Sequence, residues 1–155
     1  MKTGNIMLIH SKYDPIAWLI RKITKSYWNH VAWVVHHDTL LEATASRIGL
    51  SPIGKYLNWK YDFCFIKLKN ISEEKLQQAI SYALQFQTKR HYISYLKLLI
   101  KYYLAENKVP IMGFTCSNFI ARGLETINYY FINPKFKSPY FITPKDIAES
   151  KNEHV

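Results

Sequence analysis

The sequence predicts an α+β fold, in which a small antiparallel sheet packs against helices, as one domain over residues 1–155. Two observations favour this class. Short apolar runs typical of strands alternate with longer segments of helical periodicity. Hydrophobic residues make up 48% of the chain and aromatic residues 15%, which is typical of a packed globule with a sizeable core. No repeat, low-complexity tract or linker divides the chain.

The periodicity places each element to within a few residues. Strands are expected at residues 5–10, 30–36, 39–44 and 61–68. Helices are expected at residues 15–25, 72–87, 92–106, 116–128 and 144–150. A capping residue followed by proline is typical of a helix start, because proline suits the first helical position. Three such starts are predicted, at Asp14-Pro15, Ser51-Pro52 and Thr143-Pro144.

The chain is strongly basic, with 21 Lys and Arg against 11 Asp and Glu and a net charge of +10. This excess favours anionic partners such as phospholipid head groups or acidic polymers. The basic residues are scattered, however, as expected for a solvated surface. No zinc-ligand spacing or RNA-binding signature is present, so we expect no nucleic-acid partner. No obligate protein partner is indicated either.

The N-terminal apolar run is too short for an export signal, since it ends at His10. No stretch reaches the ~18 to 20 apolar residues of a membrane span. We therefore expect a cytoplasmic protein, with export by a dedicated secretion machine left open. Residues 92–104 are unusually apolar and aromatic, with Lys97 and Lys101 one helical turn apart. They predict either a core helix with its lysines in solvent or a helix facing a membrane or acyl chain.

Cys116 is the candidate nucleophile, because it lies where a helix is expected to begin. Gly113 interrupts the chain before it, and Thr115 can cap the helix. Apolar residues then recur at helical spacing, at Phe119, Ile120, Leu124 and Ile127. In the first turn, the unpaired N–H groups and the helix dipole favour a thiolate over a thiol. The alternative is that Cys116 is a small buried packing residue.

His30 is the candidate general base, and Glu42 is the candidate carboxylate that orients it. A three-residue turn at residues 36–38 would place Glu42 diagonally across from His30, within reach of long side chains. A two-residue turn at residues 37–38 would send Glu42 to the opposite face of the sheet. The strand register therefore decides whether the pair forms. Glu42 could also be an exposed glutamate on an edge strand.

The other histidines and the second cysteine have simpler interpretations. His36 and His37 are expected to be polar turn residues. We expect no metal, because adjacent histidines on a strand point to opposite faces, and no cofactor. Cys64 lies in the apolar run Phe63-Cys64-Phe65-Ile66, which predicts a buried strand and a packing role.

Five segments together resemble the YiiX-like permuted papain-fold cysteine hydrolases of the NlpC superfamily. The lecithin:retinol acyltransferase-like enzymes are more distant relatives of that group with the same order of motifs. In chain order the segments are Gly4-Asn5-Ile6-Met7-Leu8-Ile9, Asn29-His30-Val31-Ala32, Leu41-Glu42-Ala43, Thr115-Cys116-Ser117-Asn118-Phe119-Ile120-Ala121-Arg122 and Thr143-Pro144-Lys145-Asp146-Ile147. The spacing from histidine to acid, 42 − 30 = 12 residues, is also similar to that family's.

The resemblance implies a circularly permuted papain-like fold with Cys116 as nucleophile, His30 as general base and acid, and Glu42 as the residue that orients the imidazole. It implies that the backbone amide of Cys116 helps to form an oxyanion hole. Tyr92 matches a tyrosine that lines the substrate site in related enzymes, although residues 88–93 lack the Gly-x-Pro-Tyr-Asp pattern often found there.

The activity that the resemblance implies is hydrolysis of an amide, either a peptide or an N-acyl bond, through a thioester acyl-enzyme. The substrate would be a peptide, another amide or an acyl lipid, and an anionic membrane surface is a further candidate partner. Two alternatives stay open. One is lipid acyl transfer or ester hydrolysis at the same site, and the other is a catalytically inactive basic binding module.

Overall fold

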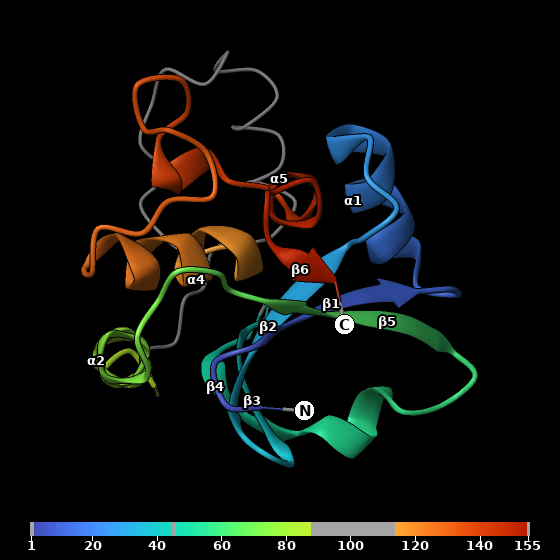
Figure 1. The fold of residues 1–155 in the computed structure, drawn as a ribbon. Coiled ribbons are helices and arrows are strands. Elements are labelled where there is room, and N and C mark those ends of the chain that lie inside the picture. The colour runs from blue at the N-terminus through green and yellow to red at the C-terminus, as the bar shows by residue number, and fades with distance from the viewer. Residues whose placement is uncertain (1, 45, 88–113, 155) are drawn as a thin grey trace.

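The computed structural model describes residues 2–44, 46–87 and 114–154 of the chain. Its centre is an antiparallel sheet of six strands in the order β4-β3-β2-β1-β5-β6. The strands are β1 (Ile6–Ser11), β2 (His30–His36), β3 (Thr39–Ala43), β4 (Ile48–Pro52), β5 (Tyr61–Lys67) and β6 (Glu153–His154). The described helices are α1 (Pro15–Thr24), α2 (Glu73–Leu84), α4 (Cys116–Glu125) and α5 (Pro144–Ala148), with the 3₁₀ turns η1 (Ile53–Tyr56) and η2 (Pro139–Phe141). The predicted α+β class is confirmed (Figure 1).

All the predicted strands occur close to their expected bounds, as β1, β2, β3 and β5, and four predicted helices occur as α1, α2, α4 and α5. The helix expected at residues 92–106 lies outside the described residues. Strand β4 was not predicted, because its sequence, Ile-Gly-Leu-Ser-Pro, carries a glycine and a proline that usually mark turns. Among the described residues, no helix has both the length and the apolar character needed to cross a bilayer.

Two of the three predicted proline helix starts are confirmed. Asp14 caps α1 by accepting hydrogen bonds from two backbone N–H groups, and Thr143 caps α5 in a capping box. The start at Ser51-Pro52 is wrong. Both residues belong to β4, where Pro52 pairs with Thr39, and η1 then begins without a side-chain cap. Pairing with β3 keeps this segment extended, and proline is tolerated there because β4 is the edge strand.

The sheet separates two clusters of buried apolar side chains. The larger cluster joins one face of the sheet to α2, α4 and α5, and its largest member is Trp33 on β2. The smaller cluster lies on the opposite face, where Ile53 and Tyr56 of η1 cover β1, β2 and β3. Figure 1 shows α2 and α4 on one side of the sheet and the turn that carries η1 on the other. Helices α2, α4 and α5 are therefore anchored to one face, while η1 covers the second.

Gly123 on α4 lies against Trp33, so we expect Gly123→Ala to destabilise the fold. A Cβ atom at this position would lie 2.8 Å from the indole ring, which is fully buried and donates a hydrogen bond to the Gly4 carbonyl at 3.2 Å. Overpacking of this kind costs about 1–3 kcal/mol, against a gain in helix propensity of up to about 1 kcal/mol. Urea unfolding would measure the net loss of stability. Gly54→Ala is the matched control, because an added Cβ there meets nothing within 4 Å.

Candidate active site

The register between β2 and β3 contains a β-bulge that brings Glu42 to the face of His30. The turn is the two-residue one, since His36 pairs with Thr39. By itself, this turn would place the Glu42 side chain on the face of the sheet opposite to that of His30. The register then shifts by one residue between Val34 and His36, so that Trp33 pairs with Leu41. A bulge adds one residue to one strand only. Beyond the bulge, the residues therefore pair as they would after a three-residue turn, and Glu42 lies on the same face as His30.

His30 and Glu42 consequently form a direct hydrogen bond. The distance from Nε2 of His30 to Oε2 of Glu42 is 2.7 Å. Glu42 is 3% exposed and the His30 side chain 15% exposed, so the pair is shielded from solvent. Glu42 lies on β3, which is an interior strand between β2 and β4, and is therefore not an exposed edge-strand residue.

The Glu42 carboxylate accepts hydrogen bonds from three further side chains. Tyr56 donates to Oε2 at 2.6 Å, and Ser51 donates to Oε1 at 2.6 Å. Lys55 also donates to Oε1, at 3.0 Å, and supplies a positive charge. A buried carboxylate needs such partners because its desolvation is costly. These donors fix the positions of both carboxylate oxygens, and therefore the orientation of the Glu42 carboxylate toward His30.

The bonding around Glu42 sets the protonation of its neighbours. Burial alone would raise the pKa of Glu42, but the bonds from His30, Ser51 and Tyr56 outweigh it and hold the pKa well below 4.5. Burial and the Glu42 carboxylate raise the pKa of Tyr56, so that its phenol stays protonated as a donor. At neutral pH the site therefore holds an ionised glutamate.

Cys116 is the first residue of α4, and a capping box defines that helix start. The Thr115 hydroxyl accepts a hydrogen bond from the Asn118 N–H at 3.2 Å. The Asn118 side chain in turn accepts one from the Thr115 N–H at 2.8 Å. Cys116 is 1% exposed and belongs to the larger buried cluster. The thiol is thus held at the N-terminus of a helix, as the sequence predicted.

His30 connects Cys116 to Glu42. Burial by itself would lower the pKa of His30, but the charge of Cys116, a side-chain hydrogen bond with it, and Glu42 raise the pKa to about 10. Because Nε2 is bonded to Glu42, Nδ1 is the ring nitrogen that remains for the thiol. The structure therefore brings three predicted site residues together in the order cysteine, histidine, glutamate.

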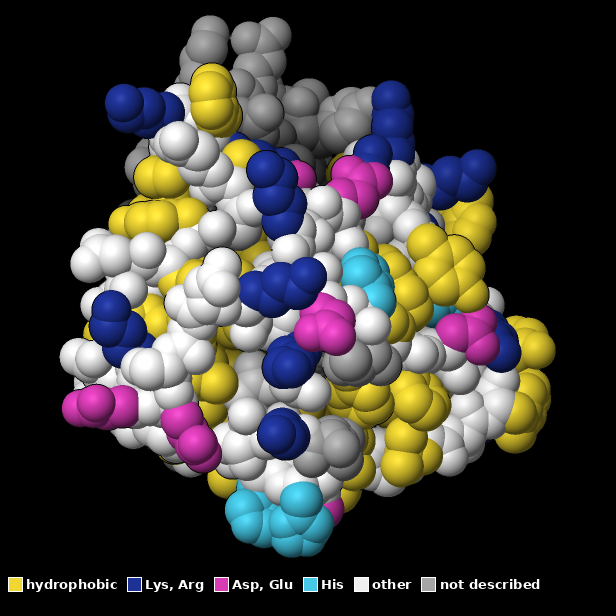
Figure 2. Space-filling view, viewed as in Figure 1, with side chains coloured by type: hydrophobic (Ala, Val, Ile, Leu, Met, Phe, Trp, Pro, Cys, Tyr) yellow, Lys and Arg dark blue, Asp and Glu magenta, His cyan; other side chains and the backbone are white. Residues whose placement is uncertain are grey.

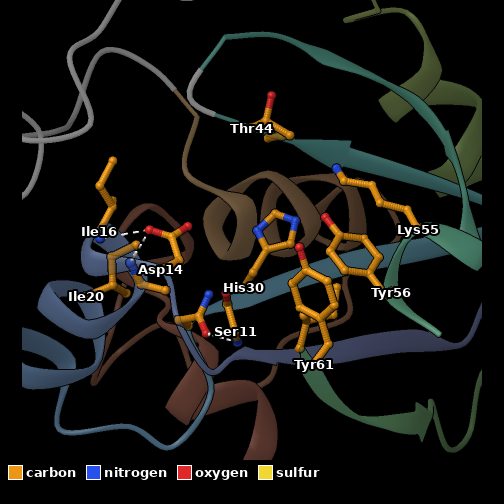
Figure 3. A pocket seen from close by; sticks show the side chains of 13 residues that line it. Ser11, Asp14, Ile16, Ile20, His30, Thr44, Lys55, Tyr56 and Tyr61 are labelled. Atoms are coloured by element: carbon orange, nitrogen blue, oxygen red, sulfur yellow. Dashed lines mark hydrogen bonds between the residues drawn. The ribbon is translucent and has the colours of Figure 1, made fainter. Parts of the chain in front are cut away.

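A pocket of about 270 Å³ opens beside the His30 ring. Figure 3 shows His30, Tyr56, Tyr61 and Lys55 on one side of it, with Asp14, Ile16 and Ile20 of the α1 region across from them. Its wall combines aliphatic side chains with hydroxyl and charged groups. Cys116 is not among the lining residues, so the pocket reaches the imidazole and not the thiol.

Some site residues escaped prediction from the sequence, and one predicted residue cannot be placed. Ser51, Lys55 and Tyr56 were missed because β4 and η1 were not expected, although buried Glu42 signalled that donors were needed. Tyr92 lies outside the described residues.

Cys64 lies on β5 as expected, but only Ile66 of its apolar run is buried, so the prediction of a buried strand is wrong there. Neither cysteine is part of a disulfide, and burial raises the pKa of Cys64.

The turn between β2 and β3 gathers the one group in the described residues that could hold a metal ion. The potential ligand atoms of His36, His37 and Asp38 lie within 4.8 Å of one another. The prediction that the two histidines point apart is wrong, since their ring centroids are 4.1 Å apart in the turn. All three side chains are exposed, and Asp38 already accepts hydrogen bonds from His36 and Thr39. We assign this cluster no role in the site at His30.

Comparison of the sequence with models of known protein families finds no family that matches. Comparison with curated proteins finds no similar sequence. The resemblance to the permuted papain-fold hydrolases therefore remains an inference from the motifs of this chain.

Proposed function

We propose that the protein is a cysteine hydrolase of the permuted papain-like type, which cleaves an amide through a thioester on Cys116. The observation that carries the proposal is the placement of His30 between Cys116 and Glu42, with the 2.7 Å bond from His30 to Glu42. A carboxylate on one ring nitrogen fixes the imidazole, so that the other nitrogen can exchange a proton with the thiol.

The acylation step follows from this geometry. The Cys116 thiolate attacks the carbonyl carbon of the substrate, which forms a C–S bond and a tetrahedral oxyanion. Collapse of this intermediate breaks the bond to the leaving amine, and the His30 imidazolium supplies the proton that the amine takes up. The raised pKa of His30, about 10, favours this protonated form while the thiolate is present. The products are the free amine and a thioester on Cys116.

Deacylation reverses the proton transfers. Neutral His30 accepts a proton from a water molecule as that water attacks the thioester carbonyl. The C–S bond then breaks, the acid product leaves, and the thiolate is restored beside the imidazolium. If an alcohol or amine replaces water, the same site performs acyl transfer, which is the alternative activity.

The oxyanion is expected to be held by backbone N–H groups at the start of α4. Cys116 occupies the first helical position, and the backbone N–H groups of the first turn point toward the N-terminal end of the helix, where they favour negative charge. The Cys116 amide therefore suits the role that the family resemblance implies. Donors of this kind typically contribute about 10²–10³ in rate.

Acyl-enzyme formation tests the proposal directly. We expect Cys64→Ser protein, incubated with p-nitrophenyl acetate, to release nitrophenol and to gain one acetyl group that hydroxylamine removes. Intact-protein mass spectrometry measures the adduct. Cys116→Ala in the same background is expected to lose both signals, because the nucleophile is gone.

A screen of N-acyl amides, peptides and phospholipid esters then separates amide hydrolysis from lipid acyl chemistry. An acetyl adduct that persists in the Cys116→Ala variant would contradict the assignment of the nucleophile. Absence of any adduct in folded Cys64→Ser protein would instead favour the inactive binding module.

A further inference from the structure

Two loops beside the His30 pocket place large aromatic side chains in solvent. Tyr13, in the loop between β1 and α1, is 68% exposed, and Trp59, between η1 and β5, is 69% exposed. Their rings are in edge contact, with centroids 5.4 Å apart. The loops are also joined through their backbones, since the Lys12 N–H donates to the Lys60 carbonyl at 3.0 Å. Tyr13 and Trp59 therefore form one continuous patch, which we call the aromatic surface.

The aromatic surface adjoins the opening of the pocket. Ser11 and Asp14, on either side of Tyr13, line the pocket, and so do Tyr56 and Tyr61, on either side of Trp59. Apolar exposure continues at Ile16 and Leu57 in the same two segments, and both are more than half exposed. The exposed residues are thus a mixture of aromatic rings and aliphatic chains at one end of the sheet, where β1 ends and β5 begins.

One cation lies against these rings. The Lys60 ammonium is 5.8 Å from the centre of the Trp59 ring, whereas Lys12 is paired with Asp62 and Lys55 with Glu42. Two carboxylates lie in the same segments: Asp14 caps α1, and Asp62 accepts from Lys12 at 2.7 Å and from Tyr27 at 2.6 Å, so that Asp62 balances the charge of Lys12. Figure 2 shows hydrophobic and cationic side chains side by side near the right-hand edge of the face that it draws.

We infer that this aromatic surface docks onto an anionic phospholipid bilayer. Trp and Tyr rings favour the boundary between head groups and acyl chains, since they are apolar with one polar group. Lys60 beside them suits an anionic head group, and the net charge of +10 attracts the whole protein to such a membrane. Exposed aliphatic side chains lie next to the rings. They favour the hydrocarbon of a bilayer as the ligand over a sugar, because a sugar would need only the aromatic rings for stacking.

Vesicle binding tests this inference without any assay of activity. We expect the protein to sediment with vesicles of phosphatidylcholine and phosphatidylserine at low salt and not with phosphatidylcholine vesicles alone. Replacing both Tyr13 and Trp59 by serine is expected to weaken binding about tenfold or more, because the apolar anchors are lost. Raising the salt concentration is expected to weaken binding further, as the charges are screened.

Matched variants make the result specific. Phe136→Ser removes an aromatic residue that is 85% exposed and lies between α4 and η2, and it is expected to leave binding unchanged. Cys116→Ala is also expected to bind like the native protein, so that failure of the hydrolase proposal and failure of this one are separate results. Equal binding by the Tyr13 and Trp59 double variant, or no binding at low salt, would overturn the inference and point to a protein or glycan partner.

Discussion

Cys116 is expected to react with iodoacetamide at about pH 6.5 roughly 100-fold faster in native protein than in His30→Ala. Only about 1% of an ordinary thiol with a pKa of ~8.5 is ionised at that pH. The imidazolium of His30 and the start of α4 both favour the thiolate of Cys116. The rate of alkylation against pH, measured by mass spectrometry, gives the midpoint of the titration. Native protein should therefore react at pH values where the variant does not.

The alkylation experiment requires Cys64→Ser in every protein, because Cys64 is a second cysteine outside any disulfide and would also be alkylated. His36→Ala is the matched histidine control, since it removes an exposed imidazole from the other end of β2. It should leave the midpoint unchanged. Midpoints near the reference of ~8.5 in both native protein and His30→Ala would contradict a thiolate–imidazolium pair. Because iodoacetamide is small, its rate also reports whether solution has access to the buried thiol.

Glu42→Gln is expected to destabilise the fold by about 3 kcal/mol at pH 5.5. The substitution keeps the shape of the side chain but removes the charge that His30 and Lys55 share. It also replaces one acceptor oxygen by a donor, which faces the hydroxyl groups of Ser51 or Tyr56. Urea unfolding would measure the difference in free energy from native protein.

The pH dependence of this loss follows from the two pKa shifts. Glu42 has a pKa below 4.5 in the folded protein, so its contribution is present above about pH 4.5 and is lost as the pH falls through the folded value. His30 has its pKa raised from 6.5 to about 10, so its contribution is complete below pH 6.5 and is lost as the pH rises through 10. The difference between native protein and Glu42→Gln should therefore be largest between about pH 4.5 and 6.5, and smaller near pH 10.

A surface glutamate supplies the control for Glu42. Glu153 on β6 is about half exposed and lies 3.7 Å from Lys67. Exposed ion pairs contribute about 0–1 kcal/mol, so Glu153→Gln should change stability little and without the same pH dependence. If Glu42→Gln proved as mild as Glu153→Gln, the network around Glu42 would not be a stabilising part of the fold.

Much of the fold and of the site could be predicted from local sequence patterns. Helical periodicity after a capping residue placed Cys116 at the start of α4, where the capping box of Thr115 and Asn118 occurs. Short apolar runs correctly gave β2 and β3, and with them the elements that carry His30 and Glu42. These features depend on residues within a few positions of one another, and for that reason they can be read from sequence.

Other features depend on contacts between distant segments. Ser51 looked like a helix cap, because serine before proline favours that role locally, but its hydroxyl donates to Glu42 and its backbone pairs with β3. Tyr56 carried no signal at all, since one tyrosine among 12 is not distinctive. Its function as a donor to Glu42 follows only from the position of η1 over the sheet.

The sequence by itself determined the α+β class, most element positions and the residue types that suit a cysteine, histidine and acid site. Only the tertiary structure decided that His30 and Glu42 meet. Side chains alternate between faces along a strand, so one extra residue reverses the outcome. The bulge between Val34 and His36 supplies this extra residue on β2. It allows a two-residue turn while Trp33 still pairs with Leu41. Local sequence specifies the turn, but packing of both sheet faces selects the register.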